Sequence, residues 1–329
     1  MAVARANWWL TLWVAFLGCG CAHEPASVPQ GLAAPVPLEL ESCTVDGAPG
    51  CKVVSPDYLI YSTVPDRQLL TRVGELMEGA LSVYHSVAPD VPQSLHPMEC
   101  YLFATRPQWA AFTRTHTGDD AAIYLRVNRG GYTVGDWFVA YWIGEVGTFS
   151  VAAHEGWHQY VARHLRGRLP PFLEEGLACM FEEVRWEGEL PRWDLSRNTA
   201  RLSSLRVAVD HRETIPLSQL VQMHAGQVVG KPSSQIEAFY AQSWGFARFL
   251  YDADGARYRP ALRRMLADAS RGSLFRDSSR QFPRGPLWDP ATARPMLEHY
   301  LQMDMSQIEA AYERYIRSIA AHGGGAGET

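Results

Sequence analysis

The feature that most constrains the fold is a change of hydrophobic pattern near Thr148. Before it, short runs rich in aromatic and β-branched residues, typical of strands, alternate with helical spacing. One helical face begins beside Asp66, which is placed to cap it, and runs to Tyr84. The predicted strands are 57–63, 98–104 and 123–127, with one or two more within 132–143, and a short helix is predicted at 108–114.

After Thr148 the pattern is helical to the end of the patterned chain. The predicted helices are 149–166, 172–184, 198–208, 217–223, 235–252, 257–269, 290–302 and 307–320. Strands first and helices afterwards predict an α+β fold. We expect a small N-terminal mixed sheet with helices, packed against a mostly α-helical C-terminal part.

The first 22 residues predict a signal peptide. Trp8 to Leu17 is an apolar run too short to span a bilayer comfortably, and small residues follow it. The segment around Cys19 and Cys21 resembles a bacterial lipobox, in which a Cys is lipidated and becomes the new N-terminus. Cleavage after Ala22 without a lipid is the alternative. Either route predicts export to the periplasm or cell surface, with membrane association through the lipid in the first case.

Composition divides the remaining chain. Residues 23–40 are rich in Pro and Ala and predict an extended tether. Residues 41–322 are expected to form one domain, divided into an α/β part (41–147) and a helical part (148–322). The glycine-rich tail, 323–329, predicts disorder.

The charge and the cysteines add two further expectations. A formal net charge of −5 gives no support for a nucleic-acid partner. Cys43 and Cys51 flank a turn-rich stretch and could form a disulfide in an oxidising compartment. Cys100 and Cys179 lie in apolar runs and are expected to be buried free thiols.

The sequence VAAHEGWHQY, within the first helix after Thr148, carries the strongest chemical signal. His154 and His158 are four residues apart, so both imidazoles project from the same helical face and can reach one zinc ion. Glu155 lies at the edge of that face. There it can act as general base toward a water molecule at the metal instead of binding the metal itself.

Two residues compete to be the third ligand. His164 stands where the third His of a metzincin would be, but Val161 occupies the position of the glycine at which the chain must turn. If the helix simply continues, His164 lies about 120° around from His158. Glu175 is the competitor, on a second helix opened by Pro170 and Pro171. We favour Glu175.

The pattern of His154, Glu155, His158 and Gln159, followed by Glu175-Gly176-Leu177-Ala178, resembles the gluzincin zinc metallopeptidases. The wider stretch, and FYAQSWG at 239–245, resemble the peptidase MA-like domains of bacterial envelope proteins. The resemblance implies a zincin-like active-site helix, Zn²⁺ held by His154, His158 and Glu175, and Glu155 as general base. Glu174 matches a variable position, though a register error of one residue would exchange the two carboxylates.

These residues predict zinc-dependent hydrolysis of a peptide or protein substrate at the cell envelope. Gluzincins often stabilise the oxyanion with a Tyr or His from a later helix, and Tyr240 is the candidate here. Its alternative role is that of a core aromatic residue. Two other functions stay open: a non-catalytic envelope lipoprotein that retains the fold, and a zinc hydrolase of a non-peptide amide. Substrate preference is not readable from the sequence.

Overall fold

The computed structural model describes residues 31–127, 130–228, 231–274 and 288–322. The predicted signal peptide, Cys19, Cys21 and the tail at 323–329 lie outside these ranges, as do the first eight residues of the tether. The remaining tether residues before Glu39 form no helix or strand. Among the described helices, none has the length and apolar character needed to cross a bilayer.

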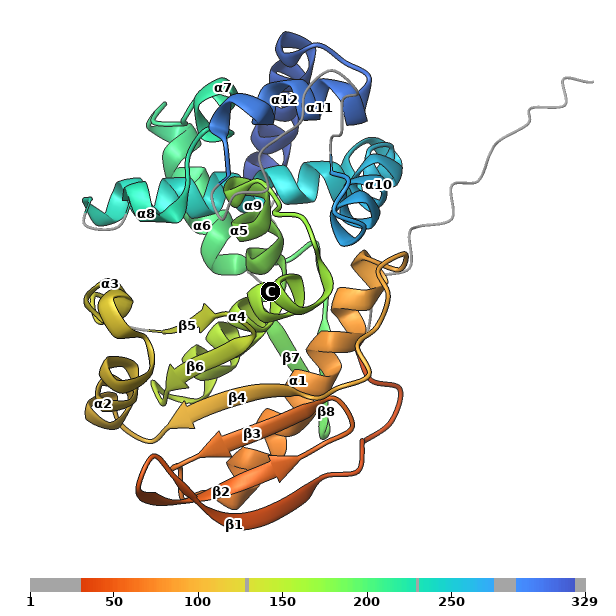
Figure 1. Ribbon diagram of the computed structural model, residues 1–329. Helices are drawn as coiled ribbons and strands as arrows, with labels where there is room; N and C mark the ends of the chain where they lie inside the picture. Colours follow the sequence, from red (N-terminus) through yellow and green to blue (C-terminus); the bar gives the residue numbers. More distant parts are fainter. Residues whose placement is uncertain (1–30, 128–129, 229–230, 275–287, 323–329) are drawn as a thin grey trace, which may run out of the picture.

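The N-terminal half is built on a six-stranded mixed sheet in the order β1-β2-β3-β4-β6-β5 (Figure 1). β3, β4 and β6 are parallel neighbours, whereas β1, β2 and β5 join by antiparallel pairing. β5 therefore forms one edge of the sheet. The strands are β1 (Glu39–Val45), β2 (Ala48–Val54), β3 (Tyr58–Ser62), β4 (Met98–Phe103), β5 (Gly131–Val134) and β6 (Trp137–Tyr141).

Helices cover both faces of this sheet because the side chains of each strand alternate between two cores. In β4, Cys100 belongs to the main core, whereas Phe103 belongs to a smaller core on the other face. α1 (Arg67–Val87) and α4 (Glu145–His164) pack on the main-core side, and α2 (Arg106–His116) contributes Trp109 to the smaller core. Asp66 caps α1 as predicted, accepting a hydrogen bond from the Leu69 N–H at 3.0 Å.

The C-terminal half is mostly helical, so the predicted α+β class is confirmed. α5 packs against α9, and α6 and α12 also contact α9. α9 contains a break of non-helical backbone at Ala253 to Gly255. The helices are α5 (Pro171–Met180), α6 (Thr199–Asp210), α7 (Leu217–Leu220), α8 (Ala225–Val228), α9 (Ser233–Ala256), α10 (Arg259–Ser270), α11 (Ala293–Leu301) and α12 (Met305–His322), with 3-10 turns at Gly118–Asp120 and Pro290–Thr292.

Two secondary-structure predictions are wrong. The strand predicted at 123–127 is instead the short helix α3 (Ala121–Tyr124) followed by a turn; a short apolar run does not distinguish helix from strand by periodicity. The helix predicted at 172–184 ends at Met180, and the chain then forms the hairpin β7 (Val184–Glu187) and β8 (Leu190–Trp193). This hairpin returns to the first half and packs against α1.

The possible disulfide between Cys43 and Cys51 is not formed, because both are free thiols. β1 and β2 form a hairpin in which Cys43 lies opposite Gly50 and Cys51 lies opposite Ser42. Adjacent positions on a strand point to opposite faces of a sheet, so the two thiols point away from each other. Cys100 and Cys179 are buried free thiols, as predicted.

Candidate metal centre

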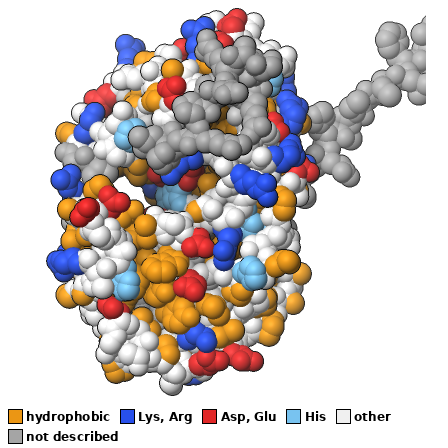
Figure 2. Space-filling view, in the orientation of Figure 1, with side chains coloured by type: hydrophobic (Ala, Val, Ile, Leu, Met, Phe, Trp, Pro, Cys, Tyr) orange, Lys and Arg blue, Asp and Glu red, His pale blue; other side chains and the backbone are white. Residues whose placement is uncertain are grey.

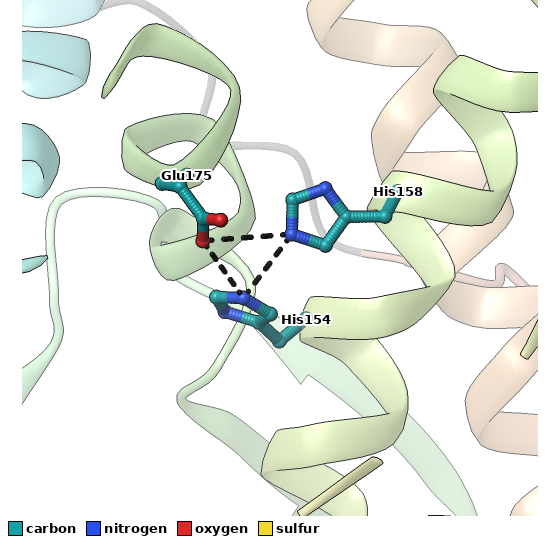
Figure 3. A group of neighbouring side chains, drawn as sticks. All are labelled: His154, His158 and Glu175. Atoms are coloured by element: carbon teal, nitrogen blue, oxygen red, sulfur yellow. Dashed lines mark hydrogen bonds and ion pairs between the residues drawn. The ribbon is translucent and has the colours of Figure 1, made fainter. Parts of the chain in front are cut away.

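Helices α4 and α5 bring three side chains to one point (Figure 3). His154 and His158 project from the same face of α4, one turn apart. α4 continues through Val161 to His164, so the chain does not make the turn that a third His ligand would need. α5 begins at Pro171 and places Glu175 opposite the two imidazoles.

The three facing atoms form a nearly equilateral triangle. The Nε2 atoms of His154 and His158 are 3.3 Å apart, and Glu175 Oε2 lies 3.4 Å from the first and 3.6 Å from the second. Two ligands of a tetrahedral metal ion, each bonded at about 2.1 Å, are separated by about 3.4 Å. The triangle therefore has the size that three ligands of one metal ion require, and the group could hold such an ion.

Burial supports the same conclusion. Glu175 Oε2 is buried and has no hydrogen-bond partner among the described residues. A buried carboxylate oxygen without a donor is costly unless a cation satisfies it. The donor set, two imidazole nitrogens and one carboxylate oxygen, is one that transition metals accept.

A carboxylate stands behind each imidazole. Glu182 Oε1 lies 2.9 Å from His154 Nδ1, and Glu174 Oε1 lies 2.9 Å from His158 Nδ1. When the Nδ1–H of each imidazole donates a hydrogen bond to its carboxylate, Nε2 carries no proton and its lone pair faces Glu175. Such carboxylate–histidine pairs orient metal-ligating imidazoles and make them better donors.

Glu182 is itself held from α6. Arg201 donates to both of its carboxylate oxygens, at 2.8 and 2.7 Å, and Asn198 Nδ2 donates to Oε2 at 2.7 Å. Asn198 also caps α6, accepting from the Arg201 N–H at 3.0 Å. The sequence prediction missed Glu182, Asn198 and Arg201. The Asn198 cap signal was readable, but nothing in the spacing links residues 182 and 201 to His154.

The charges of the cluster are strongly coupled. Burial alone would lower the pKa of both histidines. At His158 the carboxylates of Glu175 and Glu174 reverse this and raise the pKa to about 10, and at His154 Cys179, Glu175 and Glu182 raise it well above its usual value. Burial would raise the pKa of both Glu175 and Glu182, but the histidines lower both. At Glu182, Arg201 adds to this effect and the pKa falls to about 2. The cluster thus attracts positive charge, and a bound divalent cation would replace the imidazole protons.

Glu155 lies beside the triangle and binds none of its atoms. Thr133 Oγ1, on edge strand β5, lies 3.1 Å from Glu155 Oε2 and 3.0 Å from the Glu155 carbonyl oxygen. This hydroxyl fixes the carboxylate between α4 and the sheet edge. Thr133 was not predicted, since its proximity arises from the packing of β5 on α4.

Tyr240 lies close to the cluster, on α9. Its ring centroid is 6.4 Å from that of His154, and the Arg201 guanidinium lies 5.0 Å from the centre of the Tyr240 ring. The negative charge of Glu175, together with burial, raises the pKa of the Tyr240 phenol well above its usual value. Tyr240 therefore stays a protonated hydrogen-bond donor across the physiological range.

His164 points away from this group. Its Nδ1 donates to the Tyr160 carbonyl at 2.9 Å, and its Nε2 accepts from the Ser94 N–H at 3.1 Å. Both ring nitrogens are thus engaged elsewhere. Of the two residues weighed as third ligand, the structure brings Glu175 to the histidines and leaves His164 outside.

The triangle opens into a cleft of about 1770 Å³ between the two halves of the molecule. Figure 2 shows this face hollowed there, with histidine and acidic side chains in the hollow. Glu155 and Tyr240 line the cleft together with the three converging residues. β5 lies along it, from Gly131 to Val134.

In comparisons with known proteins, no family model matches this chain and no curated protein matches it significantly. The arrangement of the site itself is therefore the basis for a functional proposal.

Proposed function

We propose that this chain is an exported zinc metallopeptidase that hydrolyses peptide bonds at the cell envelope. The observation that carries the proposal is the convergence of His154, His158 and Glu175 on one point beside a further carboxylate, Glu155, which is held by Thr133. The N-terminal segment of the sequence supports export.

Zinc held by these three residues would supply Lewis acidity, polarising the carbonyl to be attacked and lowering the pKa of water. Glu155 is placed to accept the proton of the attacking water and to deliver it to the departing nitrogen. Thr133 holds that carboxylate in position by its 3.1 Å contact. Tyr240 is the donor available to the developing oxyanion, since its hydroxyl stays protonated.

The cleft supports a peptide substrate. Its volume exceeds the roughly 300–1,000 Å³ typical of small-molecule pockets. β5 pairs with β6 on one side only, so its other edge offers unpaired backbone groups inside the cleft. An extended peptide can add to such an edge by main-chain hydrogen bonds.

The proposal is tested by the metal content of the purified protein, with Glu175→Ala and His164→Ala as matched variants. We expect about one zinc per chain, lost in Glu175→Ala and retained in His164→Ala. Glu155→Gln should keep the zinc while peptide hydrolysis falls by at least about a hundredfold.

Three results would decide against it. Absence of zinc from the wild-type protein after purification without chelators would favour a non-catalytic envelope protein. Zinc retained in Glu175→Ala would remove Glu175 from the ligand set. Zinc bound without cleavage of casein or peptide libraries, but with cleavage of peptidoglycan fragments, would instead identify a non-peptide amide hydrolase.

A further inference from the structure

β5 and α4 run side by side along the cleft, and their chains run in the same direction. A Cβ added at Gly130 would lie 3.7 Å from Val151, near the start of α4. Further on, Thr133 contacts Glu155, and Gln159 Nε2 donates to the carbonyl of Asp136 at 2.7 Å. The two elements therefore advance together along the cleft, with Glu155 between its two ends.

The end beside the start of α4 is apolar. Tyr124, Val127 and Val151 line it together with the backbone of Gly130. The other end, at the last turn of α4 and just beyond it, carries three arginines that line the cleft: Arg163, Arg166 and Arg168.

These arginines differ in their partners. Arg163 is engaged: it pairs with Asp136 at 3.1 Å and donates to the Pro97 carbonyl. Arg166 and Arg168 are exposed, and within the described ranges neither side chain has a hydrogen bond or an ion pair. The backbone beneath them is fixed, because the N–H groups of Arg166 and Gly167 both donate to the Ala269 carbonyl.

Among the residues that the structure describes, the acidic groups of the cleft leave these two charges uncompensated. Asp136 is paired with Arg163, and Glu182 with Arg201. Of the other described carboxylates that line the cleft, Glu174 and Glu175 contact His158, and Glu155 accepts a hydrogen bond from Thr133. Two exposed guanidinium groups therefore face solvent at one end of the cleft, where they can bind a carboxylate.

Pairing geometry determines which part of a peptide reaches them. A strand added antiparallel to β5, the more stable pairing, places its N-terminal part at the Asp136 end and its C-terminal part at the Gly130 end. α4 runs about 9 Å from His158 to its last residue, His164, at 1.5 Å per residue. An extended chain covers that distance in about three residues.

We propose that the cleft selects peptides with acidic side chains on the N-terminal side of the reacting bond, and that Arg166 and Arg168 are the residues that recognise them. This inference rests on the proposed peptidase function and names the substrate class of the same site. Aliphatic or aromatic side chains fit the opposite end, beside Tyr124, Val127 and Val151.

The test measures peptide binding to the full chain carrying Glu155→Gln and loaded with zinc. Three fluorescent eight-residue peptides are compared: one with two Glu in its N-terminal half, its Gln counterpart, and the isomer with both Glu in its C-terminal half. We expect the first to bind about five- to tenfold more tightly than the other two at low ionic strength. The difference should shrink in about 1 M salt, because the charges are exposed.

Variants assign the effect. Arg166→Gln with Arg168→Gln should abolish the preference, whereas Arg114→Gln, an exposed arginine on α2 outside the cleft, should leave it unchanged. Equal binding of the Glu and Gln peptides, a preference for the C-terminal isomer, or a preference that survives the double variant would each overturn the inference.

The outcome is separable from that of the proposed function. Cleavage of unbiased peptides by the wild type, without any binding preference in the Glu155→Gln protein, would leave the peptidase proposal standing and remove this inference. A preference in binding without cleavage by the wild type would support acidic-peptide recognition and remove the peptidase proposal.

Discussion

At the scale of single residues, adjacent glutamates have separate roles at His158. Neighbouring helix positions point about 100° apart, so Glu174 and Glu175 approach the imidazole from different sides. Glu174 Oε1 lies 2.9 Å from Nδ1, whereas Glu175 Oε2 lies 3.6 Å from Nε2. A shift of one residue in α5 would exchange the two, so the start of α5 at Pro171 decides which carboxylate faces the histidines.

Removal of the carboxylate behind His154 should weaken the metal site. Glu182→Gln keeps the shape of the side chain but loses the charge that orients His154 and pairs with Arg201. We expect zinc affinity to fall by about 10- to 100-fold. Competition with a chromogenic chelator measures this.

Glu187→Gln is the matched control, because Glu187 is exposed and pairs with Arg192 across the hairpin β7–β8. An unchanged affinity in Glu182→Gln, or an equal loss in Glu187→Gln, would show that the carboxylate behind His154 does not tune the metal site.

At the scale of elements, the position of Glu175 depends on how closely α5 packs against α9. A Cβ added at Gly176 would lie 2.1 Å from the Ser243 carbonyl oxygen, which is backbone and cannot rotate away. A similar constraint joins α1 and α4, where a Cβ at Gly156 would lie 2.7 Å from the Tyr84 hydroxyl. That hydroxyl donates to the Ala153 carbonyl at 2.6 Å, one residue before His154.

We therefore predict that Gly176→Ala forces α5 away from α9. The free energy of unfolding should fall by about 2 kcal/mol, as for other overpacked cores, and zinc content should fall with it because Glu175 moves. Urea unfolding and metal analysis measure the two effects.

Gly147→Ala in α4 is the control, since the Cβ there would meet only the side chain of Ile143, at 3.1 Å, which can shift. Alanine also favours the helix over glycine by up to about 1 kcal/mol. A Gly176→Ala protein with wild-type stability and zinc content would refute the close-packing argument.

At the scale of the whole molecule, α4 joins the two halves, since it packs on the sheet side against α1 and on the helical side against α5. Its last residue, His164, reaches a second cavity, of about 350 Å³, that lies away from the cleft. His85 of α1 lines the same cavity, with its ring 5.8 Å from that of His164. Asp57 and Glu78 are the acidic residues in its lining.

These two histidines predict an acid limit of stability. Burial lowers the pKa of both. The charge of His164 lowers the pKa of His85 further, whereas at His164 the hydrogen bond to the Tyr160 carbonyl opposes the effect of burial and Arg163 adds to it. Below their ordinary pKa of about 6.5, the unfolded chain therefore binds more protons at these positions than the folded protein does. Their contribution to stability should consequently fall as the pH drops below about 6.5, and should be full above it.

Denaturant unfolding is measured between pH 5 and 8, in steps of about half a pH unit, for the wild type and for the double variant His85→Gln, His164→Gln. The double variant should lose stability less steeply on the acid side. The histidines at the metal centre contribute equally to both proteins, so the difference isolates the cavity pair. Parallel curves would refute the assignment.

The sequence by itself determined the class of the fold and the helix that carries His154, Glu155 and His158, because both follow from local periodicity and from spacing along one helix. It also placed Glu175 as the favoured third ligand. It did not predict the β1–β2 hairpin, the end of α5 at Met180 or the β7–β8 hairpin, where short apolar runs permit more than one local structure.

Only the tertiary structure decided how the site is supported. Glu182, in the segment after α5, and Thr133, on β5, contact the histidine helix, and Arg201 on α6 holds Glu182. No spacing in the sequence encodes those contacts. The same packing set Cys43 and Cys51 on opposite faces of one hairpin. Local chemistry follows from neighbours in the chain, whereas a supporting contact depends on which surfaces bury each other, and that is a property of the whole molecule.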